Sequence, residues 1–253
     1  MGTLVGKKAM VTGTSQGIGA AISKALIEAG CDICMHYFHS ADGPLQMQQY
    51  AISRNQRAIC LQADLRNEQE VIRLIHESGE FLGQIDILVN NSGALVQRRK
   101  LSEVDNDFWQ SLLDINLKTM MMVTREAYPL LNKTEGASIV NISSLAGRKG
   151  GHPGSLVYST CKGAVLTWTR SLSAELGPMG IRVNAVAPGF IQGTKFHEEH
   201  TSEESAKKTI ESIPLGRSGK PEDVARAVVF LASEYDGFIN GETIDINGGV
   251  YCA

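Results

Sequence analysis

Short apolar runs alternate with stretches of helical periodicity from one end of the chain to the other. The runs are almost continuous in apolar residues, which is typical of strands that are buried on both faces. Crossovers of helical length between such strands indicate a parallel sheet covered by helices on both sides. The predicted strands span residues 8–12, 32–36, 58–62, 85–90, 137–142, 181–187 and 242–246, and the clearest helical stretches span 18–30, 68–83, 108–131 and 163–177.

The alternation covers the whole chain, which contains no repeat, low-complexity tract or linker. We therefore predict one doubly wound α/β domain over residues 1–253, with a seven-stranded parallel sheet. The polar, charged segment at about residues 190–214 departs from this rhythm. Ligands bind outside the carboxyl ends of the strands in such sheets, so this segment is a candidate substrate lid. A solvated surface excursion is the alternative.

Charge and composition exclude several kinds of partner. A formal net charge of −3 gives no electrostatic case for binding nucleic acid or an anionic membrane. No apolar run approaches the ~20 residues that span a bilayer, and the start of the chain runs directly into a predicted strand rather than a signal peptide.

Cys31 and Cys34 lie too far apart along a strand to form a disulfide. We expect buried thiols in a protein of the reducing cytoplasm.

Tyr158 and Lys162 are four residues apart, and on a helix this spacing puts both side chains on one face. A phenol titrates near pH ~10, and proton transfer near neutral pH needs a pKa roughly three units lower, a difference of about 4 kcal/mol. A cation about 4 Å away supplies roughly that amount at an effective dielectric constant of ~20. We therefore expect Lys162 to lower the pKa of Tyr158.

A glycine-rich turn follows the first predicted strand and opens a helix. Its glycines permit a tight turn and a close approach of the backbone to a pyrophosphate, while the helix N-terminus offers free N–H groups to phosphates. After the first strand of a doubly wound sheet, such a turn predicts a nucleotide site, although a purely structural turn is the alternative. The expected contacts are Gly13, Ser15, Gln16, Gly17, Ile18 and Gly19.

Further motifs accompany this turn and the Tyr158–Lys162 pair. They are Asn90-Asn91-Ser92-Gly93 after the fourth strand, Asn116, Ser144 and Pro188-Gly189. With these motifs in this order, the chain resembles the short-chain dehydrogenase/reductase family over about residues 6–250. The resemblance implies a Rossmann fold. Sugar or uronate dehydrogenases and 3-oxoacyl-acyl-carrier-protein reductases are similar. Two departures are a Ser144 fourteen residues before Tyr158, where many members have thirteen, and a Thr194 that sits one residue late.

The resemblance implies roles for the catalytic residues. Tyr158 would be the general acid/base that faces the carbonyl or alcohol oxygen, and Lys162 would also hold the nicotinamide ribose. Ser144 would donate a hydrogen bond to the same oxygen, with Ser143 as the rival for this role. Asn116 would position a water that links Lys162 to solvent, or alternatively satisfy the helix backbone.

The resemblance also implies a nicotinamide dinucleotide cofactor. The acidic residue that would bind a ribose 2′-hydroxyl and mark NAD is replaced by Tyr37, so a 2′-phosphate is not repelled and His39 or Ser40 could bind it. However, Gln16 stands where NADP users often carry Arg or Lys. We expect NADP or NAD, with NADP slightly favoured. The remaining implied contacts are Asp64 (or, alternatively, a helix cap at this residue), Leu65, Asn91, Gly93, Pro188, Gly189, Ile191 and Thr194.

Two loops at predicted strand ends carry positive charge in an otherwise acidic chain, residues 94–100 and 148–154. They have few bulky apolar residues, which disfavours a steroid or another large apolar ligand. We expect a small, polyhydroxylated and anionic substrate such as an oxo-uronate; solvated charges or subunit contacts are the alternative. The expected contacts are Arg98, Arg99, Arg148 and His152, with Lys149 nearby.

Three functions are open at this point: a reductase or dehydrogenase of a polar sugar derivative, a 3-oxoacyl-acyl-carrier-protein reductase, and a catalytically silent nucleotide-sensing protein. The intact set of Ser144, Tyr158 and Lys162 argues against the third. The family resemblance further implies a homotetramer. The Met-rich segment 118–123 and the apolar end near Val250 are the candidate subunit contacts.

Overall fold

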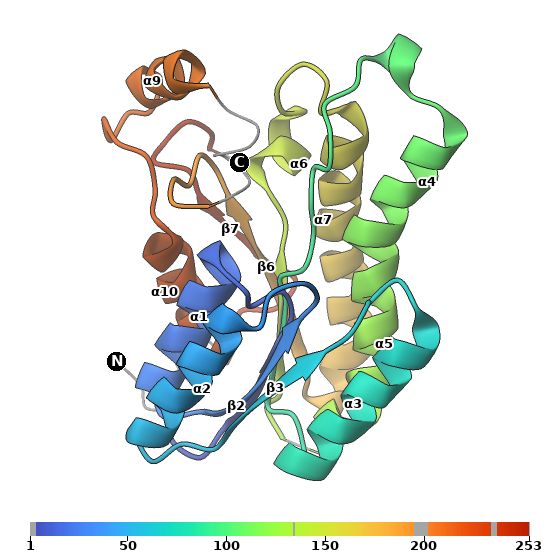
Figure 1. Ribbon diagram of the computed structural model, residues 1–253, viewed down its shortest axis with the longest axis vertical. Helices are drawn as coiled ribbons and strands as arrows, with labels where there is room; N and C mark the ends of the chain where they lie inside the picture. Colours follow the sequence, from blue (N-terminus) through green and yellow to red (C-terminus); the bar gives the residue numbers. More distant parts are fainter. Residues whose placement is uncertain (1–3, 134, 195–201, 234–236, 253) are drawn as a thin grey trace.

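Seven strands form one parallel sheet in the computed structural model, which describes residues 4–133, 135–194, 202–233 and 237–252 (Figure 1). The strand order is β3-β2-β1-β4-β5-β6-β7. The strands are β1 (Lys8–Val11), β2 (Asp32–Tyr37), β3 (Ala58–Gln62), β4 (Ile87–Asn90), β5 (Ser138–Ile142), β6 (Arg182–Pro188) and β7 (Thr243–Ile246). Their bounds lie within two residues of the predicted ones. The doubly wound α/β fold is confirmed.

The chain reverses its direction across the sheet between β1 and β4, which are hydrogen-bonded neighbours. At such a switch point the loops that follow the two strands diverge to opposite sides and leave a crevice between them. The architecture therefore places the residues after β1 and β4, the glycine-rich turn and the segment that begins at Asn91, on either side of one opening.

Helices cover both faces of the sheet (Figure 1). One layer contains α1 (Gly17–Glu28), α2 (Asp42–Ser53) and α10 (Pro221–Ala232), and the other contains α3 (Glu68–Leu82), α5 (Thr119–Leu131) and α7 (Leu156–Leu176). The remaining helical segments are η1 (Leu101–Glu103), α4 (Asn106–Leu113), η2 (Asp114–Lys118), α6 (Leu145–Lys149), η3 (Gly177–Met179) and α9 (Glu203–Glu211). No helix among the described residues is both long and apolar enough to cross a membrane.

The two layers are packed by alternate residues of the same strands. Ala9 and Val11 face the layer of α1 and α10, whereas Met10 between them faces the layer of α3 and α5. Cys31 and Cys34 likewise belong to opposite layers, and both are buried free thiols. Burial raises the pKa of each thiol to about 12, so neither is a thiolate near neutral pH.

Two helical features differ from the sequence pattern. The pattern does not identify α2, because only Pro44 and Ala51 of this helix are buried. Pro44 is the third residue of α2, where its missing N–H has no intrahelical partner to lose. The stretch predicted as one helix at 108–131 is continuous, but η2 inside it is a π-helical turn.

Candidate active site

A cleft of about 1110 Å³ lies outside the carboxyl ends of the strands. It is lined by the turns that follow β1, β2, β4, β5 and β6, by the first turns of α7 and by α9, and Figure 1 shows α6 and α9 at this end of the molecule. The expected site residues that line it are Gly13, Ser15, Gln16, Gly17, Ile18, Gly19, His39, Asn91, Gly93, Arg98, Ser144, His152, Tyr158, Lys162, Pro188, Gly189, Ile191 and Thr194. Six others do not line it: Tyr37, Leu65, Asp64, Arg99, Asn116 and Arg148.

The glycine-rich turn is shaped for a close approach of phosphate. Gly13 has a φ of +71°, and a Cβ on Gly19 would lie 2.1 Å from the carbonyl oxygen of Gly13. The N-cap residue of α1, Gln16, makes no side-chain capping hydrogen bond to the described residues, so the first N–H groups of this helix are open to a ligand. These features fit the pyrophosphate of a dinucleotide.

Asn91 and Thr12 fasten the two sides of the crevice together. The Nδ2 atom of Asn91 donates to the carbonyl oxygens of Thr12 and Gly13, each at 2.9 Å. In return, Thr12 Oγ1 accepts from the backbone N–H groups of Asn91 and Ser92 at 3.0 and 3.1 Å. Asn91 therefore fixes the backbone on which the glycine-rich turn is built, as well as lining the cleft.

The adenosine end of the cleft differs from the expectation. Phe38, His39 and Ser40 line it, whereas Tyr37 does not, and the Leu65 side chain is buried. Asp64 forms an ion pair with Arg66, whose guanidinium lies 2.6 Å from the Asp64 carboxylate. This pairing lowers the pKa of Asp64. The alternative role of Asp64 as a helix cap is wrong, because Asn67 caps α3 by accepting from Gln69 N and Glu70 N.

Tyr158 and Lys162 lie on α7; Lys162 is buried, and Tyr158 is partly buried. The ammonium of Lys162 is 5.8 Å from the centroid of the Tyr158 ring and donates to the carbonyl oxygen of Ile142 at 2.9 Å. Burial raises the pKa of Tyr158 to about 12, against a smaller lowering by the hydrogen bond with Ser144, and burial lowers the pKa of Lys162 to about 8. The expected lowering of the phenol's pKa by Lys162 is not seen in this structure, because burial has the largest effect on Tyr158 and the lowering effect comes from the hydrogen bond with Ser144.

The two neighbouring serines have different environments. Ser144 is the N-cap of α6 and hydrogen-bonds with Tyr158. Ser143 is buried, and its hydroxyl donates to the carbonyl oxygen of Lys162 at 2.7 Å. Ser143 thus secures the backbone of α7, while Ser144 and Tyr158 bring two hydroxyl groups together. Such a pair can hold one substrate oxygen between them and exchange a proton with it.

Asn116 lies in the π-helical turn η2 and is 1% exposed. Its Oδ1 accepts from Ala94 N at 3.0 Å, and its Nδ2 donates to the carbonyl oxygens of Ala94 and Leu112. The side chain therefore satisfies backbone groups, which matches the alternative reading of this residue. A Cβ on Gly93 would lie 2.8 Å from Asn116 Oδ1 and 3.0 Å from Lys162 Nζ, so Gly93 keeps both groups close together. A bridging water at this place stays a prediction.

The positive charges divide into two groups. Arg98, Lys149 and His152 line the cleft, and burial, followed by the charges of Arg98 and Lys149, lowers the pKa of His152. Arg99 instead pairs with Asp105 at 2.9 Å and lies over the ring of Phe108.

Arg148 points away from the cleft. Its Nε atom is 3.1 Å from the carboxylate of Asp245, and its NH2 group donates to the carbonyl oxygen of Thr243 on β7. The expectation that Arg99 and Arg148 contact the substrate is therefore corrected, because each is engaged elsewhere. Consecutive residues on a helical turn or a loop point in different directions, which the sequence does not resolve.

His36 and the helix α9 are parts of the site that the sequence pattern does not identify. His36 lines the cleft from the end of β2, where the strand pattern assigns it to the core. Ser205 and Thr209 of α9 also line the cleft, with Ile213 just beyond the helix. The candidate lid at 190–214 thus contributes residues to the cleft, although its central part, 195–201, lies outside the described residues.

Known proteins are similar to this chain in sequence and in fold. The family model described as enoyl-(acyl carrier protein) reductase matches residues 13–251. The 3-oxoacyl-acyl-carrier-protein reductase of Synechocystis sp. is 35% identical over 255 residues, which covers 99% of each chain.

Two solved structures are also similar. An NADH-dependent reductase responsible for alginate metabolism, A1-R', has a TM-score of 0.89, with 29% identity over 99% of each chain. A short-chain dehydrogenase from Burkholderia cenocepacia, solved in complex with NADP, has a TM-score of 0.90, with 31% identity over 98% of each chain. With the glycine-rich turn, the Ser144–Tyr158 pair and Lys162 in one cleft, the chain belongs to the short-chain dehydrogenase/reductase family of NAD(P)-dependent oxidoreductases.

Proposed function

We propose that this oxidoreductase acts on the carbonyl or secondary alcohol of a small, polar, anionic sugar derivative, such as an oxo-uronate. The observation that carries the proposal is the group formed by Arg98, Lys149 and His152, which line the same cleft as Ser144 and Tyr158. A carboxylate that pairs with Arg98 gains a charge-assisted hydrogen bond, which fixes the orientation of the substrate. The similarity to a reductase of alginate metabolism also supports this substrate class.

Arg98 is suited to bind a ligand anion. Its one hydrogen bond among the described residues goes to the carbonyl oxygen of Pro153 at 3.4 Å, and burial lowers its pKa. Unlike Arg99, it has no carboxylate partner in the described part of the chain. A partly desolvated guanidinium with free donors favours a bidentate carboxylate.

The chain's own groups fit the chemistry at the reacting oxygen. The bound dinucleotide supplies hydride transfer at the nicotinamide. Tyr158, kept protonated by burial, donates its proton to the carbonyl oxygen in the reducing direction, and Ser144 donates a second hydrogen bond to the same oxygen. Lys162, whose pKa burial lowers to about 8, donates to the carbonyl oxygen of Ile142 and lines the same cleft, so it is the residue that would hold the nicotinamide ribose.

Arg98→Ala tests the substrate class, with Arg99→Ala as the matched control. One charge-assisted contact is worth about 1.5–3 kcal/mol, so loss of Arg98 should raise KM for an anionic substrate about ten- to hundredfold. The effect of Arg98→Ala on KM for a neutral analogue should be small. Arg99→Ala should leave KM unchanged for both the anionic substrate and the neutral analogue. Native KM values of Arg98→Ala for every anionic substrate tested would contradict the proposal.

The second candidate function is a 3-oxoacyl-acyl-carrier-protein reductase, which the similarity to the Synechocystis enzyme favours. Turnover of an acetoacetyl thioester without turnover of any sugar acid would move the assignment to this activity. A catalytically silent, nucleotide-sensing protein is disfavoured by the joint presence of Ser144, Tyr158 and Lys162 in the cleft.

For the cofactor we propose that both dinucleotides bind and that NADP is slightly favoured. His39 and Ser40 line the cleft after β2, and the carboxylate of Asp64, whose pKa the charge of His39 also lowers, is already paired with Arg66. A 2′-phosphate there meets hydrogen-bonding groups, and none of the described residues that line the cleft carries a carboxylate. Tyr37→Asp, which adds a carboxylate at the end of β2, should shift the preference towards NAD.

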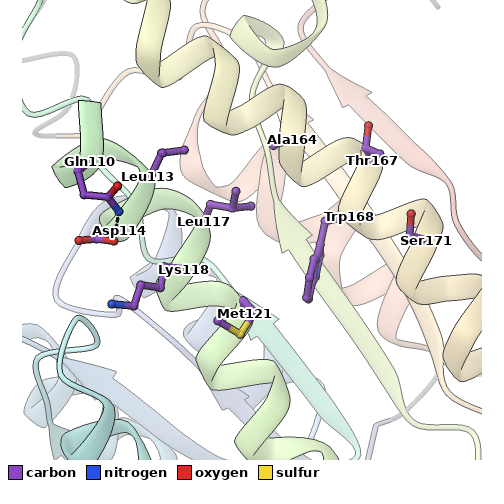
Figure 2. A pocket seen from close by; sticks show the side chains of 10 residues that line it. All are labelled: Gln110, Leu113, Asp114, Leu117, Lys118, Met121, Ala164, Thr167, Trp168 and Ser171. Carbon is purple, nitrogen blue, oxygen red and sulfur yellow. Dashed lines mark hydrogen bonds between the residues drawn. The ribbon is translucent and has the colours of Figure 1, made fainter. Parts of the chain in front are cut away.

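We further propose a homotetramer of the cytoplasm, with α9 as a lid over the substrate. An apolar groove of about 530 Å³ between η2, α5 and α7 offers a surface for a second copy, and Figure 2 shows Leu117 and Met121 facing Trp168 across it. The indole Nε1 of Trp168 is buried and has no hydrogen-bond partner among the described residues. Val250, the other candidate contact, lines the active cleft instead.

A further inference from the structure

We propose that His36 is a positioning residue of the dinucleotide site, whose neutral ring holds the backbone of Gly13 and whose protonation releases the glycine-rich turn. His36 lies near the end of β2, is 2% exposed and lines the cleft. The inference rests on the dinucleotide binding that is general to the family, and not on the identity of the substrate.

Residue 36 contacts the turn through both its side chain and its backbone. Gly13 N–H donates to Nδ1 of His36 at 3.1 Å. The carbonyl oxygen of His36 accepts from the N–H of Thr14 at 2.9 Å and from its hydroxyl at 3.1 Å. On the other side of the ring, Nε2 lies 3.0 Å from the carbonyl oxygen of Ala63. The imidazole thus joins the glycine-rich turn to the segment after β3.

These partners allow one protonation state. The carbonyl oxygen of Ala63 only accepts, so Nε2 carries the proton, and the N–H of Gly13 only donates, so Nδ1 offers its lone pair. A charged imidazolium has a second proton on Nδ1, which would face the N–H of Gly13 directly. The Gly13 contact and the positive charge therefore exclude each other.

Few other charged groups face the ring. The glycine-rich turn from Thr12 to Gly19 contains no titratable side chain. Asp64, after β3, favours the charged ring, but it is paired with Arg66, and its own N–H donates to Glu70. His39 follows in the next loop. Burial outweighs Asp64 and lowers the pKa of His36 below 6.5.

The release of Gly13 has a defined effect on cofactor binding. Gly13 is the first glycine of the turn that would approach the pyrophosphate. The turn is tightly packed, because a Cβ on Gly19 would lie 2.1 Å from the carbonyl oxygen of Gly13. The turn therefore has little room to rearrange. If the dinucleotide binds only the neutral form, its Kd rises about tenfold per pH unit once the pH falls below the pKa of the free enzyme. That window lies below about pH 6.5.

The test measures the Kd of NADH, which lacks a titrating 2′-phosphate, from pH 8 to pH 5. The wild-type Kd should rise steeply below about pH 6.5. In His36→Asn the amide oxygen still accepts from Gly13 N but the side chain does not become charged. This variant should bind NADH within about threefold of wild type at pH 8, and its Kd should not rise at low pH. His36→Phe, with no acceptor, should bind about tenfold more weakly at every pH. His76→Asn, at an exposed histidine of α3, is the control and should retain the wild-type profile.

A structural role alone would leave the pH profile unchanged. An equal acid loss in wild type and His36→Asn, or a flat wild-type profile, would overturn the proposal. Should both variants fail to fold, 15N spectra of the wild-type imidazole decide: a proton on Nε2 at pH 8 supports the assignment, and a proton on Nδ1 refutes it.

Discussion

Burial controls the reactive side chains of this site more strongly than their mutual charges do. Tyr158 and Lys162 sit four residues apart on α7, as the sequence suggests, but the ammonium is fastened to the Ile142 carbonyl and lies 5.8 Å from the ring centroid. Desolvation then raises the pKa of one group and lowers that of the other. The free enzyme therefore presents a protonated phenol, which is the form that gives a proton to a carbonyl oxygen.

Lys162→Met separates stability from function at this residue. Since the pKa of Lys162 is about 8 in the folded chain and 10.5 in the reference state, the unfolded chain binds more protons between these values. Wild-type stability should therefore gain from this group as pH rises from 8 to 10.5, by an amount on the order of 3 kcal/mol. The variant should be more stable at pH 7, lack this rise, and lose both turnover and dinucleotide affinity.

Denaturant unfolding from pH 7 to 10.5 and dinucleotide titration provide the measurements. Leu and Met have similar volume to the aliphatic part of Lys162, so Lys162→Leu should behave like Lys162→Met. An unchanged dinucleotide Kd in both variants would argue against a contact between Lys162 and the nicotinamide ribose.

Besides α7, which carries Tyr158 and Lys162, the π-helical turn η2 contacts the catalytic region through Asn116. A π-helical turn widens the helix by one residue, and here it places Asn116 against the backbone of Ala94 and Leu112. The loop after β4 approaches the same point at Gly93, which has no side chain to separate Asn116 from Lys162. The turn, the loop and α7 therefore hold one another in register.

Gly93→Ala should disturb this junction. The new Cβ would lie 2.8 Å from Oδ1 of Asn116, and three hydrogen bonds hold the Asn116 amide in place. We therefore expect at least a tenfold loss of turnover and a loss of about 1–3 kcal/mol of stability. Gly163→Ala is the matched control on α7, because its Cβ would meet only Gly147 O at 3.4 Å. Steady-state kinetics and thermal unfolding compare the two; equal activity of both variants would contradict the account.

The sequence predicts the elements well and the direction of individual side chains poorly. Continuous apolar runs identify all seven strands, because both faces of the sheet are buried. Arg98 and Arg99 are adjacent, yet one lines the cleft and the other pairs with Asp105, a difference that depends on loop geometry. His36 could not be recognised either, since a polar residue in a buried strand is informative only when its partners are known.

At the level of the whole molecule, the groove between η2, α5 and α7 is the surface that we assign to subunit association. The groove of Figure 2 is lined by apolar side chains of η2, α5 and α7 beside a buried indole N–H without a partner among the described residues. In the Met-rich segment 118–123, Met120 and Met122 belong to the buried interior, whereas Lys118 and Met121 line the groove. The surface available to a second copy is therefore narrower than the sequence suggests.

Leu117→Glu tests this surface. A carboxylate in the centre of the groove would be desolvated on association, so the variant should form smaller species than wild type while each subunit keeps its fold. Light scattering at micromolar concentration measures both proteins, and Leu101→Glu, at an exposed leucine outside the groove, is the control. A monomeric wild type would refute the homotetramer.

The most direct test of the central claim, that this cleft carries out proton-coupled reduction or oxidation through Tyr158, is the turnover of Tyr158→Phe. The substitution removes the hydroxyl that pairs with Ser144 and leaves the ring in place. Because general acid/base catalysis contributes about 10²–10⁴-fold, kcat should fall by at least about a hundredfold while the dinucleotide Kd stays within several-fold of wild type. Retention of more than about a tenth of the wild-type kcat would contradict the account.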